Sequence, residues 1–502
     1  MNMENQLRMK MPVPMSAKNR ATGSLDRALQ LLKQRGLACL ISLLFLLTNL
    51  PSQAQDVFMH GRIKVSGNGH FLQHADGTPF FWLGDTGWEL FHRLTLEEIN
   101  LYFNNRTQKG FNVIQAVLLA EMEGLTRPDR YGDLPLLNCN PDTPNEKYFL
   151  FVDSVIRLAA SKNLYMGLLP AWGDKVTRMW GAGPAVFNPE NAFRYGKWLG
   201  TRYRNYPNIL WILGGDRPPA TDSVDYRPVW RAMAAGIKEG AGEAAFITYH
   251  PWGGEKSTSQ YIHNESWLNM NMIQSGHGGG HDVPIWNLIS RDWKLRPAKP
   301  VLDAEPNYED HPVNPWPEWN PANRYYRAYD VRKQTYRSVF TGGCGVTYGH
   351  HSVWQFWSPR EEKINHADRY WTDALDRPGA FQVGYLKRLI ESRSQLTRVP
   401  DQSLILKGQG EKGEYITAFR DSSFSYLMIY MPVGKTITIR MDSMKTDNVN
   451  VWWFNPSTGT TVPIGLVSRR KTMDFTSPTL GEGNDWVLVA DDPAFHYKSP
   501  GF

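Results

Sequence analysis

Cysteine is scarce in this chain of 502 residues, which contains only three. Cys39 lies in an N-terminal segment that differs in character from the rest, so Cys139 and Cys344 are left for the remainder. Whether or not these two pair, they exclude a disulfide framework as the basis of the fold. Internal repeats and low-complexity linkers are also lacking, so we expect domains that pack closely.

An excess of positive charge is likewise lacking once the N-terminus is set aside. The formal net charge is +6, but residues 1–54 hold seven Lys or Arg against Glu4 and Asp26. The rest of the chain is therefore close to neutral. No basic field argues for a nucleic-acid partner.

The N-terminal segment has the pattern of an export signal. A basic region ends at Lys33–Arg35, an apolar run covers 37–50, and Ser52-Gln53-Ala54 offers small residues for cleavage. The run is too short for a comfortable membrane span. Cys39 lies at the front of the apolar run, whereas a lipid-anchor cysteine would lie after it. We expect 1–54 to be a signal peptide and the mature protein to be periplasmic, cell-surface or secreted, without a stable membrane anchor.

Residues 55–395 alternate short apolar runs with amphipathic helical stretches. That order predicts βα units around a parallel sheet, and eight of them fit a (β/α)₈ TIM barrel. A doubly wound open sheet is the alternative, but no Gly-rich nucleotide fingerprint follows the first strand, and we expect no cofactor. The expected strands are 80–84, 112–118, 164–169, 209–213, 246–249, 270–274, 300–303 and 345–348. The expected helices begin at Thr95 and cover 146–161, 189–203, 284–293, 324–340 and 380–393.

Residues 396–502 lose the helical period and show short alternating runs separated by turn sequences. The runs at 415–419, 426–430, 436–439, 451–454 and 486–489 predict a small all-β sandwich domain. We expect it to support the barrel.

Polar and aromatic side chains follow the predicted barrel strands, where the reactive groups of such barrels lie. Asp216 follows the fourth strand after Gly214-Gly215, and Glu305 follows the seventh. Strands four and seven lie roughly opposite each other, so the two carboxylates can flank one glycosidic bond. We predict them as the catalytic pair. Asp85, Trp88, Trp172, His250, Trp252, His277, Asp303 and His351 are the predicted substrate-binding residues.

Each of these assignments has a structural alternative. A strand-end carboxylate can cap a helix or pair with a neighbouring cation, here Arg217 for Asp216. Asp303 competes with Glu305 for the role on strand seven, and the longer reach of Glu305 beyond the strand favours it. The pair His350-His351 lacks the spacing of a helical metal motif, so we expect no metal site. No Gly-x-Ser-x-Gly elbow is present.

The aromatic content of 13%, with 19 Trp, suits a sugar site as well as a large core. The segment 81–88 (FWLGDTGW), the Gly-Gly-Asp216 and the Asp-Ala-Glu305-Pro motifs resemble glycoside hydrolase family 140. The resemblance runs from about residue 57 to the end. It implies a barrel with a C-terminal domain labelled as collagen-binding, for which nothing in this sequence supplies a physical reason.

The resemblance further implies an apiosidase that cleaves apiofuranose from the galacturonan backbone of the pectin rhamnogalacturonan II. Its partner would then be a plant cell-wall oligosaccharide or polysaccharide, with Asp216 as acid/base and Glu305 as nucleophile. Retaining barrels usually carry Asn-Glu after strand four, whereas this chain has Gly215-Asp216. The shorter Asp puts retention in question, and another residue must hold the sugar hydroxyl. An arabinofuranosidase, a mannan-active enzyme and a non-catalytic glycan-binding adhesin remain alternatives.

Overall fold

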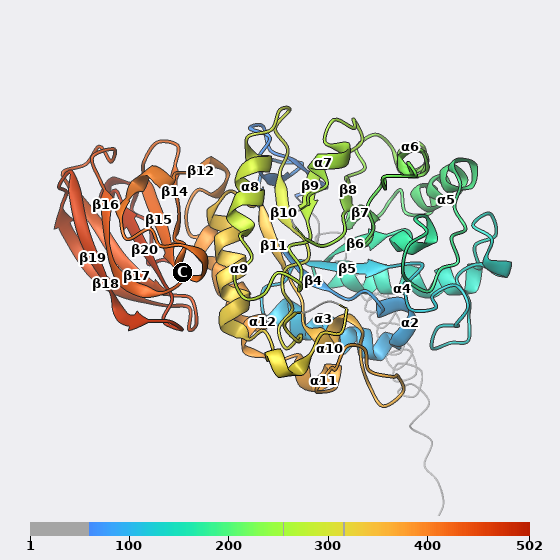
Figure 1. Cartoon of the computed structure of the whole chain (residues 1–502). Coiled ribbons are helices and arrows are strands. Elements are labelled where there is room, and N and C mark those ends of the chain that lie inside the picture. The colour runs from blue at the N-terminus through green and yellow to red at the C-terminus, as the bar shows by residue number, and fades with distance from the viewer. Residues whose placement is uncertain (1–59, 255, 315–316) are drawn as a thin grey trace, which may run out of the picture. The chain divides into compact units, whose positions relative to one another are not determined.

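A computed structural model describes residues 60–254, 256–314 and 317–502. The predicted signal peptide lies outside these residues. The described residues form one compact unit. Its centre is a closed barrel of eight parallel strands, in which β4 to β9 follow one another and β10 and β11 complete the ring (Figure 1). The predicted (β/α)₈ barrel is confirmed.

The barrel strands are short and buried throughout, as expected for a parallel sheet that is covered on both faces. Strand β4 begins at Trp82, two residues later than predicted, because Pro79–Phe80 pair in a separate sheet. The strands are β4 (Trp82–Thr86), β5 (Val113–Val117), β6 (Tyr165–Leu169), β7 (Ile209–Gly214), β8 (Ile247–His250), β9 (Met270–Ile273), β10 (Val301–Asp303) and β11 (Gly345–Tyr348).

The helices start where the sequence supplies caps. Thr95 and Glu98 form a capping box at the start of α3, and Asn188 with Pro189 starts α5. Helix α9 begins four residues later than predicted, since Arg324 ends a 3₁₀ turn with a φ of 71°. The helices are α2 (Leu90–Arg93), α3 (Leu96–Gln108), α4 (Glu146–Ser161), α5 (Pro189–Arg202), α6 (Arg227–Ala241), α7 (Ser259–Ile262), α8 (Ile285–Trp293), α9 (Ala328–Phe340), α10 (His351–Trp354), α11 (Trp371–Ala374) and α12 (Pro378–Glu391).

A small antiparallel sheet precedes the barrel and was not predicted. It consists of β1 (Ile63–Val65), β2 (Leu72–His74) and β3 (Pro79–Phe80). Its apolar residues Phe71 and Leu72 share a core cluster with Phe246 and Cys344, which lie at the starts of barrel strands. The sheet therefore packs at the end of the barrel where the strands begin, away from the strand ends.

The C-terminal domain has two antiparallel sheets that share a buried core, which confirms the predicted β domain. Strands β12, β13, β18 and β19 were not predicted. Most side chains of β18 and β19 are exposed, and β18 contains Pro463 and Gly465. One sheet contains β12 (Arg398–Pro400), β14 (Thr417–Asp421), β15 (Tyr426–Met431), β20 (Trp486–Asp491), β17 (Asn448–Asn455) and β18 (Thr460–Ser468). The other contains β13 (Ile405–Lys407), β16 (Gly434–Arg440) and β19 (Thr472–Gly481).

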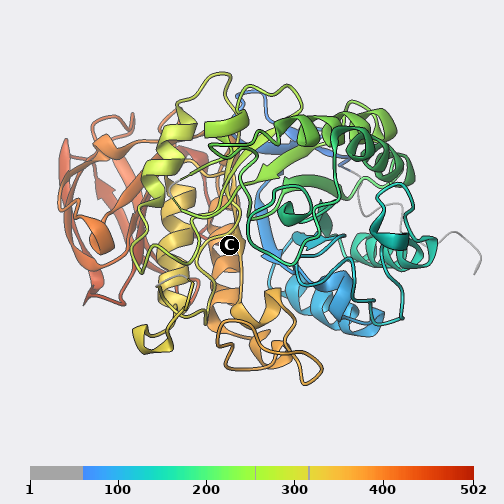
Figure 2. The ribbon, with the colours of Figure 1, turned by 45° about the vertical axis from the view of Figure 1, so that its right-hand side comes forward.

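Helices α9 and α12 connect the barrel to the β domain, and both Figures 1 and 2 show them between the two. Phe340 of α9 packs edge-on against Phe419 of β14. Arg332 of α9 forms a buried ion pair of 2.8 Å with Asp485. These contacts fit the expected supporting role of the β domain.

Cys139 and Cys344 are both free thiols, so they do not pair. Among residues 60–254, 256–314 and 317–502, we find no helix with the length and apolarity needed to cross a bilayer.

Candidate active site

The turn after β7 brings Asp216 to the mouth of the barrel. Gly214 and Gly215 have φ values of 83° and 115°, which side-chain-bearing residues rarely adopt. A Cβ on Gly215 would lie 2.7 Å from the ring of Trp172, and one on Gly214 would lie 2.3 Å from the carbonyl oxygen of His250. Only two glycines allow the chain to turn this closely between the ends of β6 and β8.

A cavity of about 760 Å³ opens at the strand ends. Tryptophan makes up much of its wall, as the sequence predicted for a sugar site. Four carboxylates also line it, whereas no Lys or Arg is found among the described lining residues. The aromatic and ionisable lining residues are Trp88, Glu89, Glu121, Trp172, Trp180, Asp216, Trp252, His277, Glu305, Tyr308, His311, Trp319 and Trp354.

Asp216 lies in the wall of this cavity with 27% of its side chain exposed. Its Oδ2 accepts hydrogen bonds from Nη1 of Arg217 at 3.1 Å and from the indole of Trp180 at 3.4 Å. Burial raises the pKa of Asp216 to about 6, against the opposing effect of Arg217 and with support from the charge of Glu305. Asp216 therefore keeps its proton in mildly acidic solution.

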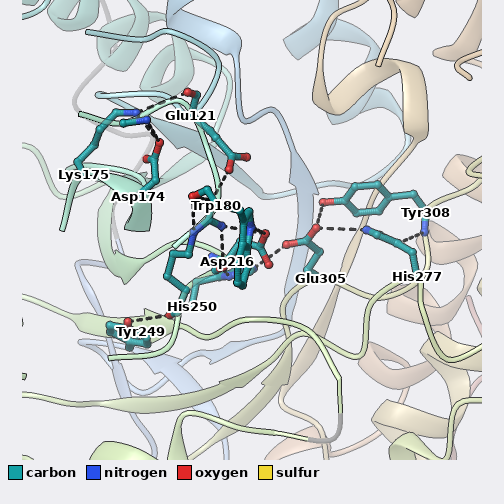
Figure 3. A network of polar contacts seen from close by, with 12 residues as sticks. Glu121, Asp174, Lys175, Trp180, Asp216, Tyr249, His250, His277, Glu305 and Tyr308 are labelled. Atoms are coloured by element: carbon teal, nitrogen blue, oxygen red, sulfur yellow. Dashed lines mark hydrogen bonds and ion pairs between the residues drawn. The ribbon is translucent and has the colours of Figure 1, made fainter. Parts of the chain in front are cut away.

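Glu305 lies across from Asp216 and is surrounded by donors (Figure 3). The hydroxyl of Tyr308 donates to Oε1 at 2.7 Å, and Nε2 of His277 lies 3.4 Å from the same atom. Nε2 of His250 lies 3.0 Å from Oε2. Burial by itself would raise the pKa of Glu305, but the hydrogen bonds and charges of His250 and His277 lower it to about 2. In mildly acidic solution, Glu305 is therefore ionised while Asp216 is protonated.

The backbone fixes the proton positions on both imidazoles in their neutral form. The N–H of Tyr308 points to Nδ1 of His277 at 3.4 Å, and the N–H of Asp216 points to Nδ1 of His250 at 3.5 Å. A backbone N–H can only donate, so each Nδ1 must accept and each ring proton resides on Nε2. Both Nε2–H groups face Glu305.

The structure brings together most of the residues that the sequence predicted for the site. Asp216, Glu305, Trp88, Trp172, Trp252 and His277 line the cavity, and His250 contacts Glu305 from beneath it. Asp303 is buried beside the site, where Ser275 donates to it at 2.8 Å and burial raises its pKa to about 7. His351 is fully buried behind the cavity and packs edge-on against His311.

Asp85 was predicted to bind substrate, but this is wrong because its side chain does not reach the cavity. Its side chain is fully buried and pairs with Nε of Arg106 at 2.5 Å, while the hydroxyl of Tyr102 donates to it at 2.6 Å. Both partners come from α3, so Asp85 fastens this helix to β4. The sequence showed that Asp85 ends a strand, but not that its side chain turns toward the helix layer instead of the mouth.

Several lining residues were missed. Tyr308 lies three residues beyond Glu305, and its position in the polar segment after β10 was the available signal. Trp180 comes from the long segment after β6, which carries no periodic pattern. Glu121 was visible as a strand-end carboxylate but was not selected; it accepts a 2.6 Å hydrogen bond from Nη2 of Arg217. Trp319 lies in a long segment without any strand-end signal. Trp354 ends α10 in the segment after β11, from which only His351 was selected.

Within the described part of the chain, no group of three or more His, Cys, Asp or Glu side chains is arranged to hold an ion. The imidazoles near Glu305 instead stack on one another, with 4.4 Å between the ring centres of His277 and His311. Burial lowers the pKa of His311 well below its usual range, so this ring stays neutral.

Two family models match the chain. The model of the apiosidase-like catalytic domain matches residues 66–397, and that of the putative collagen-binding domain of a collagenase matches residues 399–491. No curated protein matches the chain.

Solved structures of glycoside hydrolases are similar over nearly the whole chain. One, described as a glycoside hydrolase, is 33% identical, with a TM-score of 0.79 over 87% of this chain and 98% of its own. A second, described as a glycoside hydrolase family 5 protein from Bacteroides vulgatus, is 31% identical, with a TM-score of 0.80 over 89% of this chain and 96% of its own. A third from the same organism is 13% identical with a TM-score of 0.63 and shows the fold alone.

Proposed function

This chain belongs to the family of apiosidase-like catalytic domains, and from that membership we propose that it hydrolyses apiosides with Asp216 and Glu305 as its catalytic carboxylates. The observation that carries the proposal is the contrast between these two groups. One carboxyl is held protonated and the other ionised on facing walls of a single cavity. Glycosidases require this division, in which one group donates a proton and the other attacks.

We propose a retaining double displacement. In the first step Glu305 bonds to the anomeric carbon while the bond to the leaving oxygen breaks and Asp216 gives its proton to that oxygen. In the second step Asp216 takes a proton from water, whose oxygen bonds to the anomeric carbon and releases Glu305. The hydroxyl of Tyr308 and Nε2 of His277 donate to Glu305, and Nε2 of His250 lies 3.0 Å from it. These contacts support this role, because they hold the carboxylate in one orientation for attack.

The cavity suits an uncharged sugar. Trp88, Trp172 and Trp252 offer flat apolar faces for the C–H groups of a furanose ring. The ionised Glu305 would repel a uronic acid in the same place, since the described lining contains no Lys or Arg. An apiose side chain in the cavity, with its galacturonan backbone outside, fits both conditions. The plant pectin rhamnogalacturonan II is therefore the substrate we propose.

The test is incubation with rhamnogalacturonan II fragments, followed by identification of the released sugar. We expect free apiose and a fragment shortened by that residue. Release of arabinose or mannose instead would overturn the choice of apiose but not the hydrolase. Tight binding of the fragments without a new reducing end would overturn the enzyme and favour the adhesin alternative.

We also propose that the protein is exported and acts outside the cytoplasm, on the basis of the basic and apolar pattern of residues 1–54. Mass spectrometry of the protein recovered from a cell fraction tests this. A mature N-terminus near Gln55 is expected, and an intact N-terminus in the cytoplasm would contradict the proposal.

A further inference from the structure

Arg217 binds two carboxylates of the cavity wall at once. Its Nη2 donates to Oε1 of Glu121 at 2.6 Å, and its Nη1 donates to Oδ2 of Asp216 at 3.1 Å. Nε and Nη2 also donate to the carbonyl oxygen of Trp180, and Nη1 donates to that of Asp216. Every N–H of the guanidinium is thereby used, so its position and orientation are fixed.

The residues around Arg217 leave its side chain no alternative position. The side chain is fully buried, and the indole of Trp180 covers it at 4.1 Å. A Cβ on Gly173 would lie 2.6 Å from Cγ of Arg217, and one on Gly181 would lie 2.6 Å from Nη2. The guanidinium therefore acts as an immobile positive charge that Glu121 and Asp216 share.

Other charges around the two carboxylates have their own partners or face elsewhere. Nζ of Lys175 pairs with Asp174 at 2.9 Å and lies 3.5 Å from the backbone oxygen of Glu121. The ionisable groups that act on Asp216 are Arg217, Glu305 and His250, and those that act on Glu121 are Arg217, Asp216 and Asp174. Among these, Arg217 is the only cation that contacts both carboxylates.

We propose that Glu121 is a positioning residue that sets the acid strength of Asp216 by taking up part of the positive charge of Arg217. The inference rests on the proposed role of Asp216 as the acid. A guanidinium without a second partner, 3.1 Å from Asp216, would stabilise the carboxylate of Asp216 and lower the pKa of this group, so that it loses its proton. Burial raises the pKa of Glu121 to about 7, but its 2.6 Å contact with the immobile guanidinium favours its ionised form. The negative charge of Glu121 at the other end of the same guanidinium weakens the effect of Arg217 on Asp216, so Asp216 keeps the proton that the leaving group needs.

The variants Glu121→Gln and Glu121→Ala separate charge from geometry. Gln can still accept from Nη2 of Arg217, whereas Ala cannot. With an alkyl apioside, whose leaving group needs protonation, both variants should move the alkaline limb of kcat/KM down by about one pH unit, which means about tenfold less activity at pH 7. If Glu121 only held Arg217 in place, Gln would behave as wild type, and that result would overturn the proposal. Asp142→Asn, at a surface ion pair with Arg194, is the control and should leave the limb unchanged.

A second measurement does not depend on turnover. NMR of protein labelled with ¹³C at the aspartate carboxyls, with Asp216→Asn used to assign the signal, reports the titration of Asp216 directly. We expect Glu121→Gln and Glu121→Ala each to lower its midpoint, and an unchanged midpoint in both refutes the proposal. Absence of sugar release by the wild type would instead refute the proposed function, while the titration still decides the role of Glu121.

Discussion

Nε2 of His250 lies 3.0 Å from Oε2 of Glu305, at an angle too oblique for a full hydrogen bond. The ring is fully buried at the end of β8, and its Nδ1 faces the backbone N–H of Asp216. One imidazole thus connects the segments that carry both carboxylates. Loss of His250 should affect Glu305 first, because His250 is one of the groups that lower the pKa of that carboxyl.

His250→Ala should raise the pKa of Glu305, since it removes one of the groups that lower it. The acidic limb of kcat/KM should move to higher pH, and activity at the optimum should fall by about tenfold or more. A pH series on an apioside measures both effects. His496→Ala, on the exposed C-terminal segment, is the matched control, and an acidic limb equal to wild type in His250→Ala would contradict the assignment.

The two carboxylates should affect stability with opposite signs at pH 7. The pKa of Asp216 is raised to about 6, so its ionisation costs stability progressively as the pH rises from about 4 to 6. The pKa of Glu305 is lowered to about 2, so it stabilises the fold above about pH 4 and loses this effect as the pH falls toward 2.

Urea unfolding of the two amide variants measures this difference. At pH 7 Asp216→Asn should be more stable than wild type, and Glu305→Gln less stable, each by about 1–3 kcal/mol. At pH 3 the gain for Asp216→Asn should disappear, because the wild-type carboxyl is then neutral in both states. Equal shifts of the same sign at pH 7 would contradict the assigned protonation states.

The chemical roles predict different responses to an added nucleophile. Asp216→Ala and Glu305→Ala should each lower release from an alkyl apioside by about 10²–10⁴-fold or more. With a 4-nitrophenyl apioside, whose leaving group needs little protonation, azide should restore turnover in Asp216→Ala and yield an apiosyl azide of retained configuration. An azide of inverted configuration from this variant would point to an inverting mechanism.

Gly215→Ala tests the turn that presents Asp216. The substitution forces a Cβ into a φ of 115° and against the ring of Trp172, so stability should fall by about 1–3 kcal/mol and activity should collapse. Gly242→Ala is the matched control, because its φ is 96° but nothing lies within 4 Å of the added Cβ. It should lose stability and keep its activity. Full activity in Gly215→Ala would show that this turn does not fix the acid.

The link between barrel and β domain predicts a large effect from one substitution. Asp485→Ala leaves Arg332 buried without its ionic partner and should destabilise the protein by about 3–5 kcal/mol in urea unfolding. Asp474→Ala removes an exposed carboxylate of the same domain and should change stability by less than about 0.5 kcal/mol. If the two variants were equally stable, the ion pair would not hold the domains together.

The barrel and the Asp216–Glu305 cavity were predictable because periodicity and strand-end position carry them. Parallel strands buried on both faces give continuous apolar runs. The residues that follow these strands all lie at the same end of the barrel. Strand β18 was not predicted, for the opposite reason. Its Val462 and Leu466 are exposed, so the sequence shows no alternation that marks a buried face.

The errors at the site have a different cause. Asp85 and Asp216 both follow apolar residues of barrel strands, but only three-dimensional packing decides that Asp85 faces Arg106 and α3. Trp180 and Trp319 come from long segments whose path no local pattern records. Sequence position therefore selects the strands that bear a site, while the direction of each side chain depends on neighbours that are distant in the chain.

Backbone N–H groups fix the Nε2–H tautomers of His250 and His277. They thereby also restrict which groups can transfer a proton during turnover. Neither ring has a vacant nitrogen facing Glu305 with which to take up a proton, so only Asp216 shuttles one in each cycle. In mixtures of light and heavy water, the rate of a step limited by this transfer should fall in a straight line with the deuterium fraction. A curved dependence would reveal a second moving proton.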